Sequence, residues 1–571
     1  MFLVEILSFN LLKQNIKILN YDKTNLIIHK LLKQILLTKT MEVDVRKELQ
    51  KIEFFDVPGI YQRNLDLKPN EMMALQLCIE ASRLLHKSYL RQVCGDKLED
   101  YVDKLLSHAI TFGDDQQQVK ELDRFWEING GPWNRFDRDK PFLPGVGEKP
   151  LGVGFYPEDL TKEEWNSWLE QHPEDRKDFE SNTTIIRREY GKLIAIPYHK
   201  FFGENIQDAS KFLLGASEEL KDGPLADYLR QISQDLITGN YKRSDISWVK
   251  TTGFPFEIVF GPIEQYEDRF LGLKSTFEAF IGIPNQSMKK DLENFQKYLP
   301  GFDVALAKRL GYTQKGSIAP MVVIEDVIRT GAVEVGRQFT AVNLPNDREI
   351  HEKYGSKKIL SKTMIEAKTS NLISKITGKI FSNSDANFTL RSRALFILAH
   401  EIAHGMGPGM VERNGERVSL DKLLKETNLA LEEAKADTLG FVFLKYLSNQ
   451  GVLSESELKE MLLSDIAAHF VGWRISFQEA HSQAGLIKYN FLKENGALIY
   501  DSSREIISIN QEKASRFCES LSNEIIVLQN EGDYEKAKTF LERWTKVQPE
   551  IKTLIDKLAG IPLEVHPIFN V

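Results

Sequence analysis

Residues 391–409 of this chain read RSRALFILAHEIAHGMGPG. Apolar residues recur every three or four positions, which predicts a helix, and the glycines and proline at the end of the stretch stop that helix. His400 and His404 are four positions apart, so both imidazoles lie on one helix face and can bind one ion. Glu401 lies one step round the helix, where its carboxylate can contact a water on that ion. This HEXXH pattern predicts a zinc site at a helix end, with a chance match or a solvated helix face as the alternatives.

A second helical stretch, residues 419–447, carries the carboxylates that such a site needs. Glu432, Glu433 and Asp437 lie among leucines and alanines, where a carboxylate is costly to bury unless it is paired or bound to a metal. A catalytic zinc commonly takes two histidines and one glutamate and leaves a position for water. One glutamate would then be a ligand, and its neighbours would accept the second N–H of each histidine. A solvated helix face is the alternative, and Lys435 supports it in part.

The composition is that of an ordinary globular protein and excludes several classes of partner. Of 571 residues, 42% are apolar and 27% are charged, which excludes a disordered chain. The 74 basic and 82 acidic residues give a net charge of -8, which argues against nucleic acid or an anionic membrane as a partner. The cysteines at 78, 94 and 518 are too few and too scattered for a disulfide framework or a cysteine-based zinc site. They indicate a reducing, cytoplasmic environment.

The first forty residues differ from the rest. They are rich in Leu, Ile, Lys and Asn, but Glu5, Asn10 and Lys13 interrupt the apolar run that a secretory signal requires. The segment is also too polar for a membrane span. We expect residues 1–40 to be an extension upstream of the folded body, with Met41 as the true start.

The order of helical and strand-like segments predicts an α+β, mainly helical fold of two lobes with a cleft between them. One lobe is mixed and contains a small β-barrel or sheet, and the other is a mainly helical zinc-binding lobe. The Gly- and Pro-rich stretch 130–157 is expected to be a long ordered loop that shapes the cleft. The expected segments are the extension (1–40), the mixed lobe (41–285, returning at about 318–362), a helical insert (286–317), the catalytic lobe (363–510) and C-terminal helices (511–571).

These metal motifs resemble those of the dipeptidyl peptidase III family of zinc peptidases, peptidase family M49. That family pairs a His-Glu motif with a downstream Glu-Glu-x-x-Ala-Glu/Asp motif, which matches EEAKAD at 432–437. The resemblance implies one Zn²⁺ per chain, with Glu433 as the third ligand and with Glu432 and Asp437 as partners of the ligand histidines. The better-known members have one more residue in the first motif. The five-residue form found here resembles bacterial members and the domain fused to some plant Nudix hydrolases, although the chain has no Nudix signature.

Three further segments resemble the same family: EQYED (264–268), NLPND (343–347) and EAHSQA (479–484). The resemblance implies that Glu264, Asn343 and Asn346 hold the free amine of a peptide substrate. It also implies that Tyr266 forms a hydrogen bond near the scissile carbonyl and that His481 stabilises the transition state.

Each of these segments also has a simpler interpretation when taken alone. Tyr266 fits an ordinary strand aromatic, the two asparagines flank a proline and fit a turn, and His481 fits a buried core histidine. Their joint occurrence in the family's order favours the functional interpretation. One departure is Gly485, which stands where the family usually has Arg. A contact to the C-terminal side of a substrate is therefore expected to be missing.

The resemblance implies a zinc metallopeptidase that hydrolyses short peptides and releases dipeptides from their N-terminus, with Glu401 as the general base. The expected partners are short peptides, without nucleic acid or membrane. A monomer is expected, with a homodimer as the alternative. The rival functions are a zinc aminopeptidase or oligopeptidase with another cut position, and a non-catalytic binding protein that keeps the fold.

Overall fold

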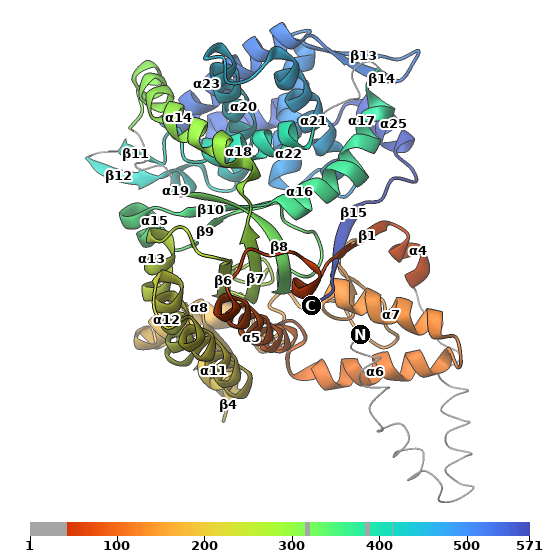
Figure 1. Ribbon diagram of the computed structural model, residues 1–571, viewed down its shortest axis with the longest axis vertical. Helices are drawn as coiled ribbons and strands as arrows, with labels where there is room; N and C mark the ends of the chain where they lie inside the picture. Colours follow the sequence, from red (N-terminus) through yellow and green to blue (C-terminus); the bar gives the residue numbers. More distant parts are fainter. Residues whose placement is uncertain (1–42, 314–319, 383–388, 414) are drawn as a thin grey trace, which may run out of the picture.

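The computed structural model describes residues 43–313, 320–382, 389–413 and 415–571 (Figure 1). The extension expected at 1–40 lies outside these residues. Within them, no helix is long and apolar enough to cross a membrane. The three cysteines are buried and form no disulfide.

The first lobe, in the lower half of Figure 1, consists of helices around short hairpins. The longest helix, α5, packs against α11 and against two strands of the central sheet. The helices are α4 (Val45–Leu49), α5 (Pro69–Cys94), α6 (Leu98–Thr111), α7 (Gln116–Asn129), α8 (Lys162–Gln171), α9 (Arg176–Phe179), α10 (Tyr198–Phe201), α11 (Gly203–Leu220), α12 (Pro224–Thr238), α13 (Lys242–Lys250) and α15 (Arg348–Tyr354). The short strands are β1 (Ile52–Val57), β2 (Trp133–Asn134), β3 (Lys140–Pro141), β4 (Thr184–Glu189) and β5 (Lys192–Pro197).

The second lobe, in the upper half of Figure 1, is almost entirely helical. Its helices are α14 (Lys289–Leu310), α16 (Lys362–Lys368), α17 (Ser374–Ile380), α18 (Leu390–Ala403), α19 (Leu420–Leu424), α20 (Thr427–Asn449), α21 (Glu455–Trp473), α22 (Ala480–Glu494), α23 (Gln511–Glu531), α24 (Tyr534–Trp544) and α25 (Pro549–Lys557). Its strands form two hairpins, β11 (Met410–Arg413) with β12 (Glu416–Ser419) and β13 (Leu498–Asp501) with β14 (Ile506–Ile509).

A five-stranded sheet lies between the lobes in the order β6-β7-β8-β10-β9. Its strands are β6 (Glu257–Pro262), β7 (Phe277–Pro284), β8 (Met321–Gly331), β9 (Ala341–Leu344) and β10 (Lys357–Ser361). Only β8 and β10 are parallel. The sequence did not distinguish a small barrel from a sheet. The structure has a sheet that is not closed into a barrel, with β6 and β9 at its edges. The Asn346 amide donates to the carbonyl of Ile263 at 3.3 Å, which links the ends of these edge strands.

The sheet separates two hydrophobic cores. Ile359 and Ile324 belong to the core of the first lobe, whereas their neighbours Leu360 and Val323 belong to the core of the helical lobe. Successive side chains of a strand point to opposite faces, so one sheet serves both cores. The predicted α+β fold with two lobes and a sheet is therefore confirmed.

The last strand, β15 (Glu564–Phe569), pairs in parallel with β1. Ile52 of β1 belongs to the core of the first lobe, whereas Val565 of β15 belongs to the core of the helical lobe. This two-stranded sheet therefore joins the two cores at a second place.

Asp245 of α13 gives the fold an expected pH dependence. Burial, with the nearby charges of Asp235 and Asp347, raises the pKa of Asp245 to about 7. An unfolded aspartate titrates near ~3.9, so the folded chain keeps a proton that the unfolded chain releases between those values. This carboxyl's contribution to the free energy of unfolding is complete below about pH 4 and is lost as the pH rises through about 7. Stability should therefore fall over that range.

We expect Asp245→Asn to raise the unfolding temperature by roughly 2–4 °C at pH 8 and to change it little at pH 4, because the amide carries no charge at either pH. Circular dichroism melting curves at both values test this, with the exposed Asp222→Asn as the control. An equal gain at both pH values would contradict the assignment.

Candidate metal centre

Helix α18 brings the HEXXH residues to the surface of the helical core. The Thr389 side chain caps its first turn, and its apolar face packs into the core of that lobe. His400 lies in the last turn and His404 is the C-terminal cap. Gly407, with φ of +80°, then adopts a conformation that side chains disfavour and turns the chain away. The pair of imidazoles therefore lies where the helix gives way to a loop.

Helix α20 crosses α18 at very short range because of Gly440. A Cβ atom at this position would lie 2.9 Å from the backbone of Ala399 and from the amide nitrogen of His400. A side chain there would push the helices apart. Glu433 lies two turns earlier on α20, so this close approach brings its carboxylate within reach of the histidines.

Three ligand atoms gather at the crossing of the two helices. The Nε2 atoms of His400 and His404 are 3.1 Å apart, and Glu433 Oε2 lies 3.3 Å and 3.5 Å from them. Tetrahedral zinc with bonds of ~2.0–2.1 Å places its ligand atoms ~3.3 Å apart. Within the described residues, no donor makes a well-directed hydrogen bond to that carboxylate oxygen, which is buried. The donor set and its spacing therefore fit a zinc-type ion.

The other carboxylates of α20 orient the histidines from behind. Asp437 Oδ1 lies 2.8 Å from His400 Nδ1, and Glu432 Oε1 lies 3.2 Å from His404 Nδ1. Each carboxylate can accept an Nδ1–H, which leaves Nε2 to bind a metal. In the sequence, Lys435 supported the alternative that this helix face is solvated. In the structure, Lys435 is fully buried and donates to Glu432 at 2.7 Å. This face of α20 is therefore part of the site and is not a solvated surface.

The charges at this centre suit a cation. Burial lowers the pKa of His400, but Asp437 and Glu433 raise it more, so that it lies well above its ordinary value. The pKa of His404 is raised in the same way by Glu433 and Glu432 against the effect of burial. Burial raises the pKa of Glu433, but the two histidines bring it well below its ordinary value. The site thus favours positive charge between these groups.

Two predicted catalytic residues lie at the edge of the ligand triangle. Glu401 is half-buried one step round α18, and its side chain has no hydrogen-bond partner within the described part of the chain. His481, in the first turn of α22, places Nδ1 3.0 Å from Glu433 Oε2 and is 72% exposed. The structure thus gathers residues from three helices at one point. His481 is an exposed residue, so the core-histidine interpretation is excluded.

The predicted amine-binding residues lie at the ends of the edge strands of the sheet. Glu264 follows β6 and forms a hydrogen bond with Asn346, and burial raises its pKa against that bond. Asn343 lies in β9, and its buried Oδ1 has no hydrogen-bond partner in the described residues. Tyr266 is 82% exposed. Nearby negative charges, chiefly that of Glu264 and also those of Glu278 and Glu433, raise the pKa of Tyr266 to about 12, so it is a hydrogen-bond donor at neutral pH.

The Gly- and Pro-rich loop 130–157 holds the EQYED segment in place. Glu267 forms ion pairs with Arg135 and, at 2.8 Å, with Lys149 of this loop. Asp268 accepts four backbone N–H groups of the following turn and the hydroxyl of Tyr156 at 2.6 Å. The buried, paired carboxylates of Glu267 and Asp268, the two residues that follow the exposed tyrosine, restrict the backbone of this turn.

Comparisons with known proteins agree with this geometry. The model of peptidase family M49 matches residues 167–439. The chain is 31% identical to the DPP III of Caldithrix abyssi, whose structure it matches with a TM-score of 0.85 over 92% of this chain and 99% of that one. The chain belongs to peptidase family M49, the dipeptidyl peptidase III family. The resemblance inferred from the motifs is confirmed, and the protein is a peptidase of the DPP III type.

Two further proteins, one of known structure and one from a plant, are similar to this chain over most of its length. The dipeptidyl-peptidase III of Corallococcus sp. strain EGB matches with a TM-score of 0.78 and 26% identity, over 92% of this chain and 96% of that one. Nudix hydrolase 3 of Arabidopsis thaliana is 27% identical over an alignment 592 residues long, which covers 93% of this chain and 74% of the plant protein.

A further carboxylate, which was not predicted from the sequence, lies beside the predicted amine-binding residues of this M49 protein. Glu278 of β7 is fully buried, and its Oε2 has no hydrogen-bond partner in the described part of the chain. Burial and the charge of Glu264 raise its pKa well above its ordinary value. The sequence feature that could have revealed Glu278 is an acidic residue within the apolar strand FEAFIGIP. A charge buried there is costly unless it is paired or hydrogen-bonded.

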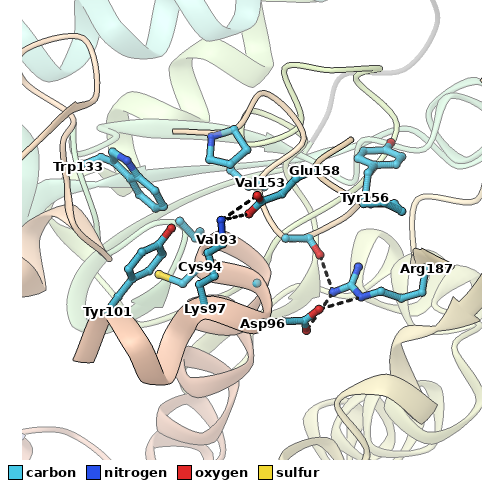
Figure 2. A pocket seen from close by; sticks show the side chains of 14 residues that line it. Val93, Cys94, Asp96, Lys97, Tyr101, Trp133, Val153, Tyr156, Glu158 and Arg187 are labelled. Carbon is cyan, nitrogen blue, oxygen red and sulfur yellow. Dashed lines mark hydrogen bonds and ion pairs between the residues drawn. The ribbon is translucent and has the colours of Figure 1, made fainter. Parts of the chain in front are cut away.

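A separate cavity of about 250 Å³ lies beyond the C-terminal end of α5 (Figure 2). Its charged groups pair with one another, Lys97 with Glu158 at 2.6 Å and Arg187 with Asp96 at 3.5 Å. None of the metal or amine-binding residues lines it. This cavity is therefore not the site of the family's chemistry.

Proposed function

We propose that the chain is a zinc-dependent dipeptidyl peptidase that removes dipeptides from the N-terminus of short peptides. The observation that carries the proposal is the triangle of His400, His404 and Glu433 atoms, 3.1–3.5 Å apart. These three residues would hold one Zn²⁺, and the buried thiols suit a reducing, cytoplasmic environment. Bound zinc supplies Lewis-acid polarisation of the scissile carbonyl and a water of lowered pKa.

The residues around the triangle would transfer the proton, stabilise the oxyanion and orient the metal ligands. Glu401 would accept the proton of the attacking water and pass it to the leaving amine. Tyr266, held protonated by its raised pKa, and His481 would donate to the developing oxyanion, each contributing about 3 kcal/mol. Glu432 and Asp437 would keep Nε2 of the histidines directed at the ion.

The acceptors at the sheet edge support cleavage at a set distance from a free N-terminus. An ammonium group has three donors, and the Glu264 carboxylate with the amide oxygens of Asn343 and Asn346 supplies matching acceptors. Anchoring the amine there fixes which peptide bond reaches Glu401. A blocked N-terminus would remove the ammonium partner of the Glu264 carboxylate and would leave the buried Asn343 Oδ1 unsatisfied.

Digestion of an eight-residue peptide with a free or an acetylated N-terminus tests the proposal. We expect dipeptides as the first products of the free peptide by mass spectrometry, and cleavage of the acetylated peptide to be roughly 100-fold slower, because about 2–3 kcal/mol of amine binding is lost. Release of single amino acids would indicate an aminopeptidase, and internal cleavage of the acetylated peptide an oligopeptidase. No cleavage by the zinc-loaded protein would indicate a binding protein.

A further inference from the structure

A second group of ionisable residues lies behind the metal centre, and two of its three members lie outside the family motifs. Asp465 and His469, four positions apart on α21, meet Asp437 of α20 with their polar atoms within 4.8 Å of one another. His469 Nε2 lies 3.6 Å from an oxygen of each aspartate, a polar contact that is longer than a hydrogen bond. All three residues have side chains at least nine-tenths buried. Asp437 is also the residue that contacts His400 at 2.8 Å.

This group is not suited to a second metal ion, because its charge is already balanced. Lys488, fully buried on α22, donates to Asp465 at 2.5 Å and to the carbonyl of Asp437 at 3.3 Å. The buried Arg393 guanidinium interacts with the charges of both aspartates. Two carboxylates facing two cations leave no excess negative charge for a divalent ion. His469 therefore lies between two carboxylates whose charges already face buried cations.

The place of the His469 ring depends on Gly485 of α22. A Cβ atom at Gly485 would lie 2.5 Å from Nδ1 and 2.6 Å from Cγ of that ring, closer than atoms can pack. The ring also lies near Trp473, with centroids 5.8 Å apart and planes at 23°. The ring is thus confined between a glycine and an indole, with Nε2 directed toward Asp437.

We propose that Gly485 and His469 form a positioning pair for the metal centre, an inference that rests on the proposed zinc function. Gly485 makes room for the His469 ring, His469 orients the Asp437 carboxylate, and Asp437 orients the ligand His400. The predicted absence of a substrate contact at Gly485 stays a prediction, and the structure adds a packing reason for a glycine at this position. The space that a side chain would need here is occupied by His469.

Zinc affinity measured by chelator competition tests the pair. We expect His469→Ala and Gly485→Ala each to weaken zinc binding by about tenfold, at the low end of the effect of groups that orient metal ligands. His469→Gln keeps a donor near the aspartates and should remain within about threefold of the parent protein. The control is Gly378→Ala, a helical glycine of α17 with open space around it, which should leave the affinity unchanged.

The double variant His469→Ala with Gly485→Ala separates positioning from packing. Removing the ring relieves the overlap with the new methyl group, so the unfolding temperature of the metal-free protein should recover relative to Gly485→Ala alone. Zinc affinity should stay low, because nothing then orients Asp437. Recovery of both quantities would show that only packing matters and would overturn the proposal. Parent-like zinc affinity in His469→Ala would overturn it as well, while leaving the proposed function intact.

Failure of the proposed function gives a different result. A parent protein that takes up no zinc in the same titration would overturn the zinc peptidase assignment and, with it, the positioning pair. The spectrum of the cobalt-loaded protein adds a readout independent of turnover. The parent and Gly378→Ala should share one ligand-field spectrum, and His469→Ala should alter it, because the orientation of the His400 ring changes. An unaltered spectrum in His469→Ala would count against the pair.

Discussion

Replacing Glu401 with glutamine is expected to lower kcat for peptide hydrolysis by about 10³-fold while zinc stays bound. An amide of the same shape cannot accept the proton of the attacking water, and general-base catalysis typically contributes ~10²–10⁴-fold. Glu401 is not among the three atoms of the ligand triangle, so its replacement leaves the donor set unchanged. KM should change little, because the predicted amine-binding residues lie at the ends of the edge strands of the sheet and not on α18.

The measurement is kcat and KM on a free-amine peptide together with zinc content by elemental analysis. Glu412→Gln, on the exposed strand β11, makes the same change of charge away from the triangle and serves as the control. Turnover within tenfold of the parent protein would rule out Glu401 as the general base. Loss of zinc from Glu401→Gln would instead mean that this residue contributes to holding the metal.

The local part of the site could be predicted from the sequence because it depends on helix periodicity. His400 and His404 share a face at a spacing of four, and Glu433 stood out as an acidic residue in an apolar helix. The contact between these two helices could not be predicted in the same way. It depends on Gly440 meeting the backbone of Ala399, which is a property of two segments far apart in the sequence.

The same limit applies to the sheet and to the residues behind the metal. Alternation of apolar side chains predicts strands but not their partners, so the order β6-β7-β8-β10-β9 and the open edge were not determined. His469 lies in a helical segment and belongs to no motif that the sequence reveals. Its contacts with Asp437 and Gly485 arise only when α21 packs against α20 and α22. A lysine at position 435 suggested that this face of the helix is exposed to solvent, yet its long side chain is buried and hydrogen-bonded.

Replacing Glu433 with glutamine is expected to have the largest effect on the metal, a loss of about 10³-fold in zinc affinity with loss of peptide hydrolysis. Zinc in a protein site is bound by ~10–16 kcal/mol in total, so one of three protein ligands contributes roughly 4 kcal/mol. A neutral amide oxygen replaces the charged donor and recovers little of it. Chelator competition and zinc content measure the loss.

The adjacent Glu432→Gln is the matched comparison, because both glutamates lie on α20 and contact the same histidine. Glu433 Oε2 lies 3.5 Å from the Nε2 side of His404, where a metal would bind, whereas Glu432 Oε1 lies 3.2 Å from the Nδ1 side. Losing an orienting partner of this kind costs about 10–100-fold in affinity, less than losing a ligand. Zinc affinity should therefore fall further in Glu433→Gln than in Glu432→Gln. The reverse order would assign the third ligand to Glu432 and would require a different rotamer of its side chain from the one in this structure.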